Sequence, residues 1–327
     1  MVESLINNTT LKSLNLQRSC QDLDHISKYL LTNTTLTDLN LQENSFFKPN
    51  QIKNFFTTLS NNHTLKGLDL SGVHCGQDIY FYLQRNPSLE RLELNHMHNP
   101  AKLGIPTPLE LKDLVEALKY NTHLKHLGLS KNSIGPEGAM LIAGLLVHNS
   151  SLKKLVLKDN SLGSSVVLIF QALEQNTTLT SLDLSDNQIG TEGFTGISQY
   201  LQNIPLKSLN LTNSIPIVTK DGFKYLFKSL KHNTTLKRLT LNSKELQVAK
   251  GGQFIDKYMI KNSSLNNLEL HEIWINNRIR PRYPDIEFIR LKYLLDNQTL
   301  TSLNIAYDHF GVESTQELLK ALSYNTT

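Results

Sequence analysis

The sequence contains the run Leu124-Lys125-His126-Leu127-Gly128-Leu129-Ser130-Lys131-Asn132-Ser133-Ile134-Gly135-Pro136-Glu137-Gly138-Ala139, which predicts a strand, a turn and a helix in that order. The strand is indicated by Leu-x-x-Leu-x-Leu, because successive side chains of a strand point to opposite faces and the leucines would share the buried one. The Ser, Asn and Gly residues that follow predict a turn. Pro136 suits the first turn of a helix, where its missing N–H leaves no hydrogen bond unmade. We expect that helix to span residues 136–147, and the equivalent helix two repeats later to span 191–201.

The same pattern recurs along the whole chain of 327 residues, at intervals of 24 to 35 residues that centre near 28. One such unit cannot bury its leucines alone, whereas stacked units share a continuous core. We therefore predict an α/β solenoid of about eleven repeats, a single domain over residues 1–327. It would be shaped as a horseshoe, with parallel strands on the concave face and helices on the convex face. The copies begin at Leu11, Leu36, Leu65, Leu89, Leu124, Leu152, Leu179, Leu206, Leu236, Leu265 and Leu300.

A second phrase, Asn-Thr-Thr or a variant of it, recurs where the helices are expected to end, for example at Asn33, Asn149 and Asn233. Asparagine tolerates the left-handed backbone conformation that closes many helices. We therefore expect these asparagines to end the helices in that conformation. The Thr or Ser that follows suits the extended entry into the next strand.

The composition is that of a folded protein without a strong charge bias. Apolar residues make up 39% of the chain, charged residues 19%, and the formal net charge is only +4, so the charge balance favours no class of partner. Two cysteines, Cys20 and Cys75, cannot form a disulfide scaffold, which favours a reducing compartment. The N-terminus has no signal-peptide pattern, and no run approaches the roughly 20 apolar residues that span a bilayer. We expect a cytoplasmic monomer without membrane contact.

The run from Leu124 to Ala139 resembles the ribonuclease-inhibitor class of leucine-rich repeats, which also includes the sensor domains of NOD-like receptors and the Ran GTPase-activating proteins. The resemblance extends over essentially the whole chain, is very specific for fold and is weakly specific for function. The repeats with Asn132, Asn160 and Asn187 at the turn position match best. The richness in Asn, Lys, Ile and Tyr, with short and irregular repeats, is similar to leucine-rich-repeat effectors of amoeba-associated intracellular bacteria such as Legionella.

The resemblance implies a non-enzymatic module that binds another protein and needs no cofactor or metal. Such a module would inhibit an enzyme by covering its active site with the concave face. As an effector, it would meet a host protein or a second effector, and would reach a host cell's cytosol by secretion. The resemblance to the Ran activators leaves a second function open, a GTPase-activating protein with Arg18 and Asn44 as polar residues at a turn edge. Neither end carries a distinct capping unit, so we expect further repeats or a secretion signal beyond the C-terminal end.

The candidate binding surface consists of the solvent-facing strand positions between the leucines and of the insertions in the two 35-residue intervals. Charges of both signs alternate in blocks on the strands, whereas a nucleic-acid groove would carry one sign interleaved with stacking aromatics. We therefore expect a protein partner with complementary charges and no nucleic acid. The second insertion, 274–284, is rich in residue types that dominate binding hot spots, although its tryptophan could instead pin the loop. The candidate residues are Asp38, Asn40, Asp69, Arg91, Glu93, His96, His126, Lys154, Lys158, Asp183, Arg238, Glu269, Trp274, Arg278, Arg280, Arg282, Tyr283 and Tyr307.

Three other signals are better explained by the fold. Cys75 follows His74, but adjacent residues seldom meet the geometry of a nucleophile and its base, and we expect Cys75 to be a small buried apolar side chain. His96 and His98 have no matching cysteine or carboxylate spacing for zinc. The Asn-x-Ser/Thr triplets coincide with the helix-ending asparagines, so no glycan is needed to explain them. Ten residues after the first leucine, where Cys75 lies in its repeat, later repeats carry Ile134, Leu162 and Ile189.

Overall fold

The structure, a computed structural model, describes residues 8–44, 47–86, 88–97, 108–213, 218–242, 254–259, 261–271 and 299–304, together with 316 and 319. The chain forms two compact units, Met1–Asn160 and Ser161–Thr327. The repeat continues from the first unit into the second, and a single domain over residues 1–327 remains a prediction.

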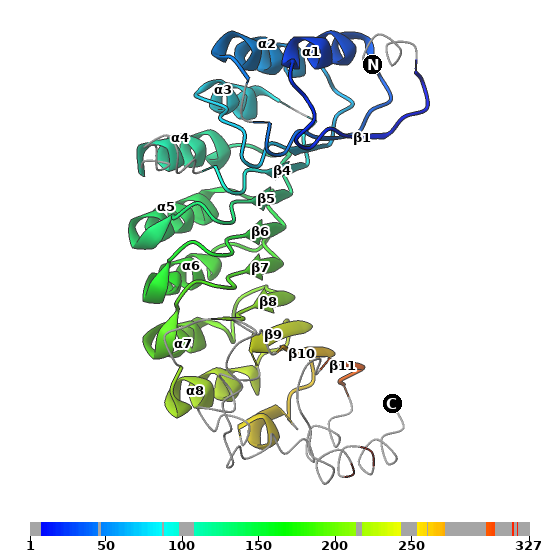
Figure 1. Cartoon of the computed structure of the whole chain (residues 1–327). Helices are drawn as coiled ribbons and strands as arrows, with labels where there is room; N and C mark the ends of the chain where they lie inside the picture. Colours follow the sequence, from blue (N-terminus) through cyan, green and yellow to red (C-terminus); the bar gives the residue numbers. More distant parts are fainter. Residues whose placement is uncertain are drawn as a thin grey trace, which may run out of the picture. The chain divides into compact units, whose positions relative to one another are not determined.

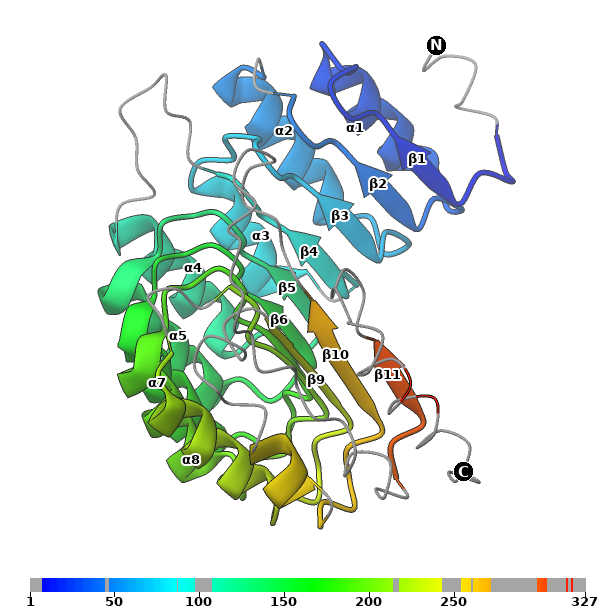
Figure 2. The same cartoon turned by 60° about the horizontal axis from the view of Figure 1, so that its bottom comes forward.

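The first unit alternates short strands with helices. Its described strands are β1 (Ser13–Asn15), β2 (Asp38–Asn40), β3 (Gly67–Asp69), β4 (Arg91–Glu93), β5 (His126–Gly128) and β6 (Lys154–Val156). Its described helices are α1 (Leu23–Thr32), α2 (Pro49–Leu59), α3 (Asp78–Arg85), α4 (Pro108–Lys119) and α5 (Gly135–His148). Each strand pairs in parallel with the strand of the next repeat. Figure 2 shows β1 to β4 as parallel arrows with α1 to α3 behind them, so this unit has a strand layer and a helix layer.

The second unit continues the alternation. Its described strands are β7 (Ser181–Asp183), β8 (Ser208–Asn210), β9 (Arg238–Asn242), β10 (Asn267–His271) and β11 (Ser302–Asn304), and they pair in parallel in chain order. Its described helices are η1 (Gly163–Ser165), α6 (Val166–Leu173), α7 (Gly190–Tyr200), α8 (Lys220–Leu230) and the π-helical η2 (Ile255–Met259). Neighbouring helices α7 and α8 pack against each other (Figure 1). Within the described parts of both units, no helix has the length and apolar character needed to cross a membrane.

The leucines of the repeat form the core between the two layers. The central strand residues Leu39, Leu127 and Leu182 are 2%, 0% and 1% exposed, which confirms their predicted inward orientation. Each such burial contributes about 1.5–3 kcal/mol relative to an exposed side chain. The predicted helices are also confirmed to within one residue at each end, because α5 spans Gly135–His148 and α7 spans Gly190–Tyr200.

The prediction for the helix-ending asparagines is wrong. Asn33 and Asn149 follow α1 and α5 in an extended conformation, with φ of −76° and −81°. Asn149 Oδ1 accepts hydrogen bonds from the N–H groups of Ser151 and Leu152, at 2.9 Å each. Its Nδ2 donates to the carbonyl of Leu118 in the preceding repeat, at 2.8 Å. The asparagine therefore recurs because its amide satisfies backbone groups at a helix end and joins two repeats, and not because it tolerates positive φ.

The same arrangement recurs at the helix ends of other repeats, whether or not the Asn-Thr-Thr phrase is intact there. At each of these positions the Nδ2 atom donates to a main-chain carbonyl at the helix end of the preceding repeat. The asparagines that do so are Asn62, Asn86, Asn121, Asn233 and Asn262.

The left-handed conformation lies instead in the turns that follow β1 to β8. Lys131, Asp159 and Asp186 have φ of 59°, 56° and 61°. The next residue in the best-matching repeats is the turn asparagine, and Asn160 Nδ2 donates to the carbonyls of Leu129 and Leu157 at 2.8 and 2.9 Å. Each turn is thus bound to the turn of the preceding repeat, which holds the solvent-facing strand residues in register.

Candidate protein-binding surface

The strand face is the solvent-facing side of β2 to β6 in the first unit. The strand register aligns two rows of side chains across it, and both rows begin with acidic or amide residues. The first row becomes basic towards β6, and the second ends in small or apolar residues. The first row is Asp38, Gly67, Arg91, His126 and Lys154, and the second is Asn40, Asp69, Glu93, Gly128 and Val156.

An ion pair crosses this face between strands that are not neighbours. Arg91 Nη2 of β4 lies 2.5 Å from Asp38 Oδ1 of β2, and Gly67 of β3 lies between them. A Cβ atom on Gly67 would overlap both side chains, so the missing side chain is what allows the contact. Because both side chains are more than a third exposed, at 48% and 35%, the pair adds at most about 1 kcal/mol to stability. Its main effect is to neutralise the charge of this part of the face.

A half-buried carboxylate lies beside this pair. Glu93 Oε1 is 3.0 Å from Nε2 of His126, and Glu93 Oε2 accepts a hydrogen bond from Asn95 Nδ2 at 3.0 Å. Gly128 faces Glu93 in register, and a Cβ atom there would overlap the carboxylate. Burial raises the pKa of Glu93, but the contacts with His126 and Asn95 and the charge of Lys154 outweigh burial, and the pKa is lowered overall.

Glu93 should therefore make the stability of the first unit depend on pH. A carboxyl whose pKa is lowered on folding contributes stability above its ordinary pKa of 4.5, and this contribution is lost as the pH falls through the lowered value. We expect the free energy of unfolding of wild type to exceed that of Glu93→Gln at neutral pH, and the difference to shrink below about pH 4.5. Urea denaturation of both proteins at a series of pH values measures this. A difference that does not change with pH would contradict the assignment.

The basic patch is formed by His126, Lys131, Lys154 and Lys158, on β5, β6 and the turns that follow them. Its three lysines are exposed, and the N–H of Lys131 donates to the carbonyl of Lys158 at 2.9 Å, so the two turns are adjacent. Among the residues that the structure describes, neither Lys131 nor Lys154 has an ion-pair partner. Asp38, by contrast, is paired with Arg91, and Glu93 contacts His126, which carries a charge only when it is protonated. The strand face therefore carries two exposed lysines without a direct ion-pair partner among the described residues.

Three further candidates of the first unit have different roles. Asn40 Oδ1 accepts the N–H of Gln42 at 2.8 Å, and Asp69 Oδ1 accepts the N–H of Ser71 at 2.9 Å, so both side chains shape the turn that follows their strand. His96 is an exposed turn residue with φ of 53°. All three are open to solvent, and His96 is the one whose side chain is not engaged by its own turn.

The remaining candidates belong to the second unit. Asp183 Oδ1 accepts the N–H of Ser185 at 2.9 Å, and Arg238 Nε lies 3.7 Å from Glu269 Oε1 across β9 and β10. These side chains occupy the predicted solvent-facing strand positions. Outside the described residues lie Trp274, Arg278, Arg280, Arg282, Tyr283 and Tyr307.

Sequence reasoning missed the two glycines of the strand face. Gly67 and Gly128 stand at solvent-facing strand positions where glycine is unfavourable, and each gives space to a charged side chain of a neighbouring strand. A glycine flanked in register by charged residues was a signal in the sequence, since the register follows directly from the repeat.

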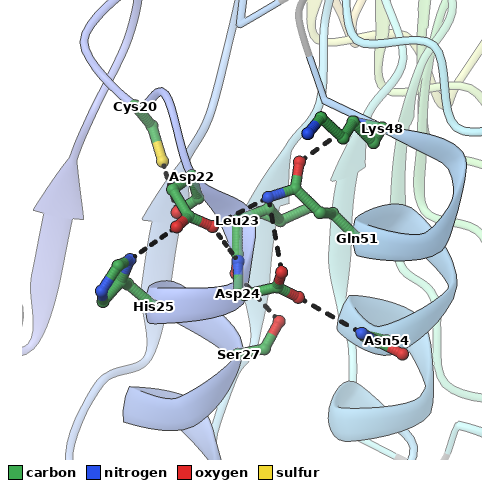
Figure 3. A network of polar contacts seen from close by, with 9 residues as sticks. All are labelled: Cys20, Asp22, Leu23, Asp24, His25, Ser27, Lys48, Gln51 and Asn54. Carbon is green, nitrogen blue, oxygen red and sulfur yellow. Dashed lines mark hydrogen bonds and ion pairs between the residues drawn. The ribbon is translucent and has the colours of Figure 1, made fainter.

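A second polar cluster, at the N-terminal ends of α1 and α2, has a structural role (Figure 3). Asp22 Oδ1 accepts hydrogen bonds from the N–H of Asp24 at 2.9 Å and from Gln51 Nε2 at 2.8 Å, and Asn54 Nδ2 donates to Asp24 at 3.3 Å. The cluster caps α1 and ties α2 to it. Burial raises the pKa of the neighbouring Cys20 thiol, which disfavours a nucleophile there. Across the described parts of the chain, no three His, Cys, Asp or Glu residues are placed to hold a metal ion.

Two segments, residues 120–143 and 175–198, match a family model described as Leucine Rich repeat. They contain β5 with the start of α5, and β7 with most of α7. These two segments are leucine-rich repeats, and the other described repeats have the same order of strand and helix. Their turn and helix-end asparagines bind the backbone of the preceding leucine-rich repeat, which accounts for the parallel register of the strands.

A search of curated proteins found no match. Among solved structures, leiomodin-1 actin-binding site 2 is 22% identical, with a TM-score of 0.36, covering 56% of this chain and 86% of its own. The tropomodulin C-terminal domain of Caenorhabditis elegans is 13% identical, with a TM-score of 0.38 and coverage of 47% and 90%. The structure of the yeast complex of Rad7 and Elc1 is 16% identical, with a TM-score of 0.38, covering 86% of this chain and 85% of its own. Because these TM-scores lie below 0.5, the leucine-rich-repeat assignment rests on the repeat and the strand register.

Proposed function

We propose that this chain is a non-enzymatic leucine-rich-repeat module that binds another protein through the strand face of its first unit. The observation that supports the proposal is the basic patch. Lys131 and Lys154 are exposed on a rigid strand-and-turn framework, and neither has an ion-pair partner among the described residues. Unneutralised charge on an ordered surface attracts a partner of opposite charge. The contacting surface of the partner would therefore be acidic.

The finer proposal is that the module is a bacterial effector that inhibits its partner by covering a functional surface. It is supported by the resemblance of the sequence to effectors of intracellular bacteria and to the ribonuclease-inhibitor class. The partner would then be a host protein or a second effector, met in the cytosol of the host cell.

The alternative of a GTPase-activating protein has weaker support. Asn44 is 4% exposed, and its Nδ2 donates to the carbonyls of Leu16 and Leu41 at 2.9 and 2.8 Å. Arg18 is paired with Glu43. Asn44 therefore holds a turn, and Arg18 would have to leave its partner to reach a nucleotide. Acceleration of GTP hydrolysis by a small GTPase would be needed to favour this alternative.

Charge reversal on the strand face tests the proposal. We expect the double variant Lys154→Glu/Lys158→Glu to lose the partner that wild type captures from a host lysate, with binding weakened by at least roughly tenfold, because the new charges repel an acidic surface. The matched control is Lys28→Glu/Lys53→Glu, which makes the same charge change at exposed positions of α1 and α2. Capture should be quantified for all three proteins. Equal capture by the strand-face variant and wild type would place the partner elsewhere.

A further inference from the structure

A pocket of about 210 Å³ lies in the first unit, at the edge where strands pass through turns into helices. Its walls come from three successive repeats. The apolar part of the lining includes Cys75, Ile79, Leu94, Leu114, Leu129 and Ile134. Its position beside the turns separates it from the solvent-facing side chains of the strand face.

The repeat spacing changes at this pocket. Ten residues after the first leucine of the third, sixth and seventh repeats, an apolar residue packs in the core. Leu162 and Ile189 do so with 0% and 2% exposure, and Cys75 with 2%. In the fourth repeat, between those of Cys75 and Ile134, the same count from Leu89 reaches the polar Asn99. The spacing of apolar residues therefore changes in the repeat that forms the middle of the pocket wall.

Two of the polar side chains in the lining are engaged by the backbone. Asn132 Nδ2 donates to the carbonyl of Leu94 at 2.7 Å, and its Oδ1 accepts the N–H of Met97 at 2.8 Å. Cys75 Sγ donates to the carbonyl of Val73 at 3.3 Å, and burial raises the pKa of this thiol far above its usual range. No carboxylate, lysine or arginine is among the lining residues. The lining therefore offers mainly dispersion contacts, and its other polar side chains are His74, Tyr80 and Ser133.

We propose that this pocket is a binding site for a small uncharged apolar molecule of about the size of a single aromatic ring. An apolar cavity of roughly 150 Å³ is large enough to hold benzene, so a pocket of about 210 Å³ has room for such a ring with a small substituent. The site is independent of the partner proposed for the strand face, because neither lysine of the charge-reversal variant lines it.

Methionine methyl groups offer a direct readout. Met97 lines the pocket, Met140 is 59% exposed on α5, and Met259 is 3% exposed in the second unit. In the full chain labelled with ¹³C at methionine methyls, titration with benzene should shift the Met97 signal in a saturable way and leave those of Met140 and Met259 unchanged. A linear drift of all signals, or no shift of Met97, would overturn the proposal.

A variant that fills the pocket provides a second test of the proposal. Cys75→Leu adds apolar volume to the wall, so the benzene-induced shift of Met97 should be lost, whereas Cys20→Ala in the first repeat should retain it. Unchanged Met140 and Met259 signals would show that the variant is folded. If Cys75→Leu does not fold, Leu111→Phe at the half-buried rim replaces it. A shift that persists in the folded filled variant would show that benzene binds elsewhere and would also overturn the proposal.

Discussion

Replacing Asn149 with alanine is expected to lower the free energy of unfolding by about 4 kcal/mol. The side chain is 2% exposed and bonds four backbone groups: the N–H groups of Ser151 and Leu152 and the carbonyls of Leu118 and Asn121. Alanine would leave the two N–H groups without an acceptor and would remove one donor from each carbonyl, and each buried polar group left unsatisfied costs about 1–3 kcal/mol before relaxation. Urea denaturation monitored by circular dichroism measures the change.

The matched control is Asn61→Ala. Asn61 is exposed and makes one long hydrogen bond, from Nδ2 to the carbonyl of Thr57 at 3.3 Å, so its loss should cost less than about 0.5 kcal/mol. Asn149→Asp would keep the oxygen that accepts from Ser151 but place a second oxygen against the carbonyl of Leu118, and should be no less destabilising than alanine. A loss below about 1 kcal/mol for Asn149→Ala would show that water replaces the amide and that the repeats are not joined through it.

The second large effect is expected at Phe223 on α8. This ring is 1% exposed and lies between two others, with centroids 5.4 Å from Phe194 in an edge arrangement and 6.4 Å from Phe227 in a stacked one. Phe223→Ala should lower the free energy of unfolding by about 4 kcal/mol, because the lost burial is accompanied by a cavity that the neighbouring rings only partly fill. The measurement is again denaturant unfolding, here with thermal unfolding as a second probe.

Tyr225→Ala on the same helix is the matched control, because it removes an aromatic ring that is not buried. Tyr225 is 40% exposed and lies beside the ammonium group of Lys224, whose nitrogen is 5.6 Å from the ring centroid. We expect its removal to cost less than about 1 kcal/mol. Because alanine favours the helix at both positions, similar losses for Tyr225→Ala and Phe223→Ala would mean that packing against Phe194 and Phe227 adds nothing beyond the contribution of an exposed ring.

The strands and helices could be predicted because their signals are local. The leucine spacing around Leu127 and the proline at position 136 mark a strand and a helix start within 16 residues, and the helix was found as Gly135–His148. The turn asparagine could be recognised from the same run. Its hydrogen bonds to the preceding repeat, such as those of Asn160 to Leu129, follow once the repeats are stacked in register.

The conformation of the helix-ending asparagines could not be predicted from the phrase that contains them. Propensity alone favours a left-handed asparagine after a helix. Asn149 has an extended backbone because the carbonyl of Leu118, 31 residues earlier, is within reach of its amide once the two repeats stack. A partner that far away in sequence has no local signal.

For the charges of the strand face, too, the sequence predicts one part and the tertiary structure decides the other. The spacing of the leucines alone predicts that Asp38, Arg91 and Lys154 face solvent, because side chains alternate between the two faces of a strand within a few consecutive residues. Which of these charges are paired depends on contacts between strands: Arg91 reaches Asp38 across Gly67, while Lys154 forms no direct ion pair among the described residues. The pocket beside Cys75 depends likewise on packing between repeats. The fold and the solvent-facing side of each strand follow from short-range periodicity in the sequence. Which charges are paired and which space stays unfilled depends on how side chains from different repeats pack against one another.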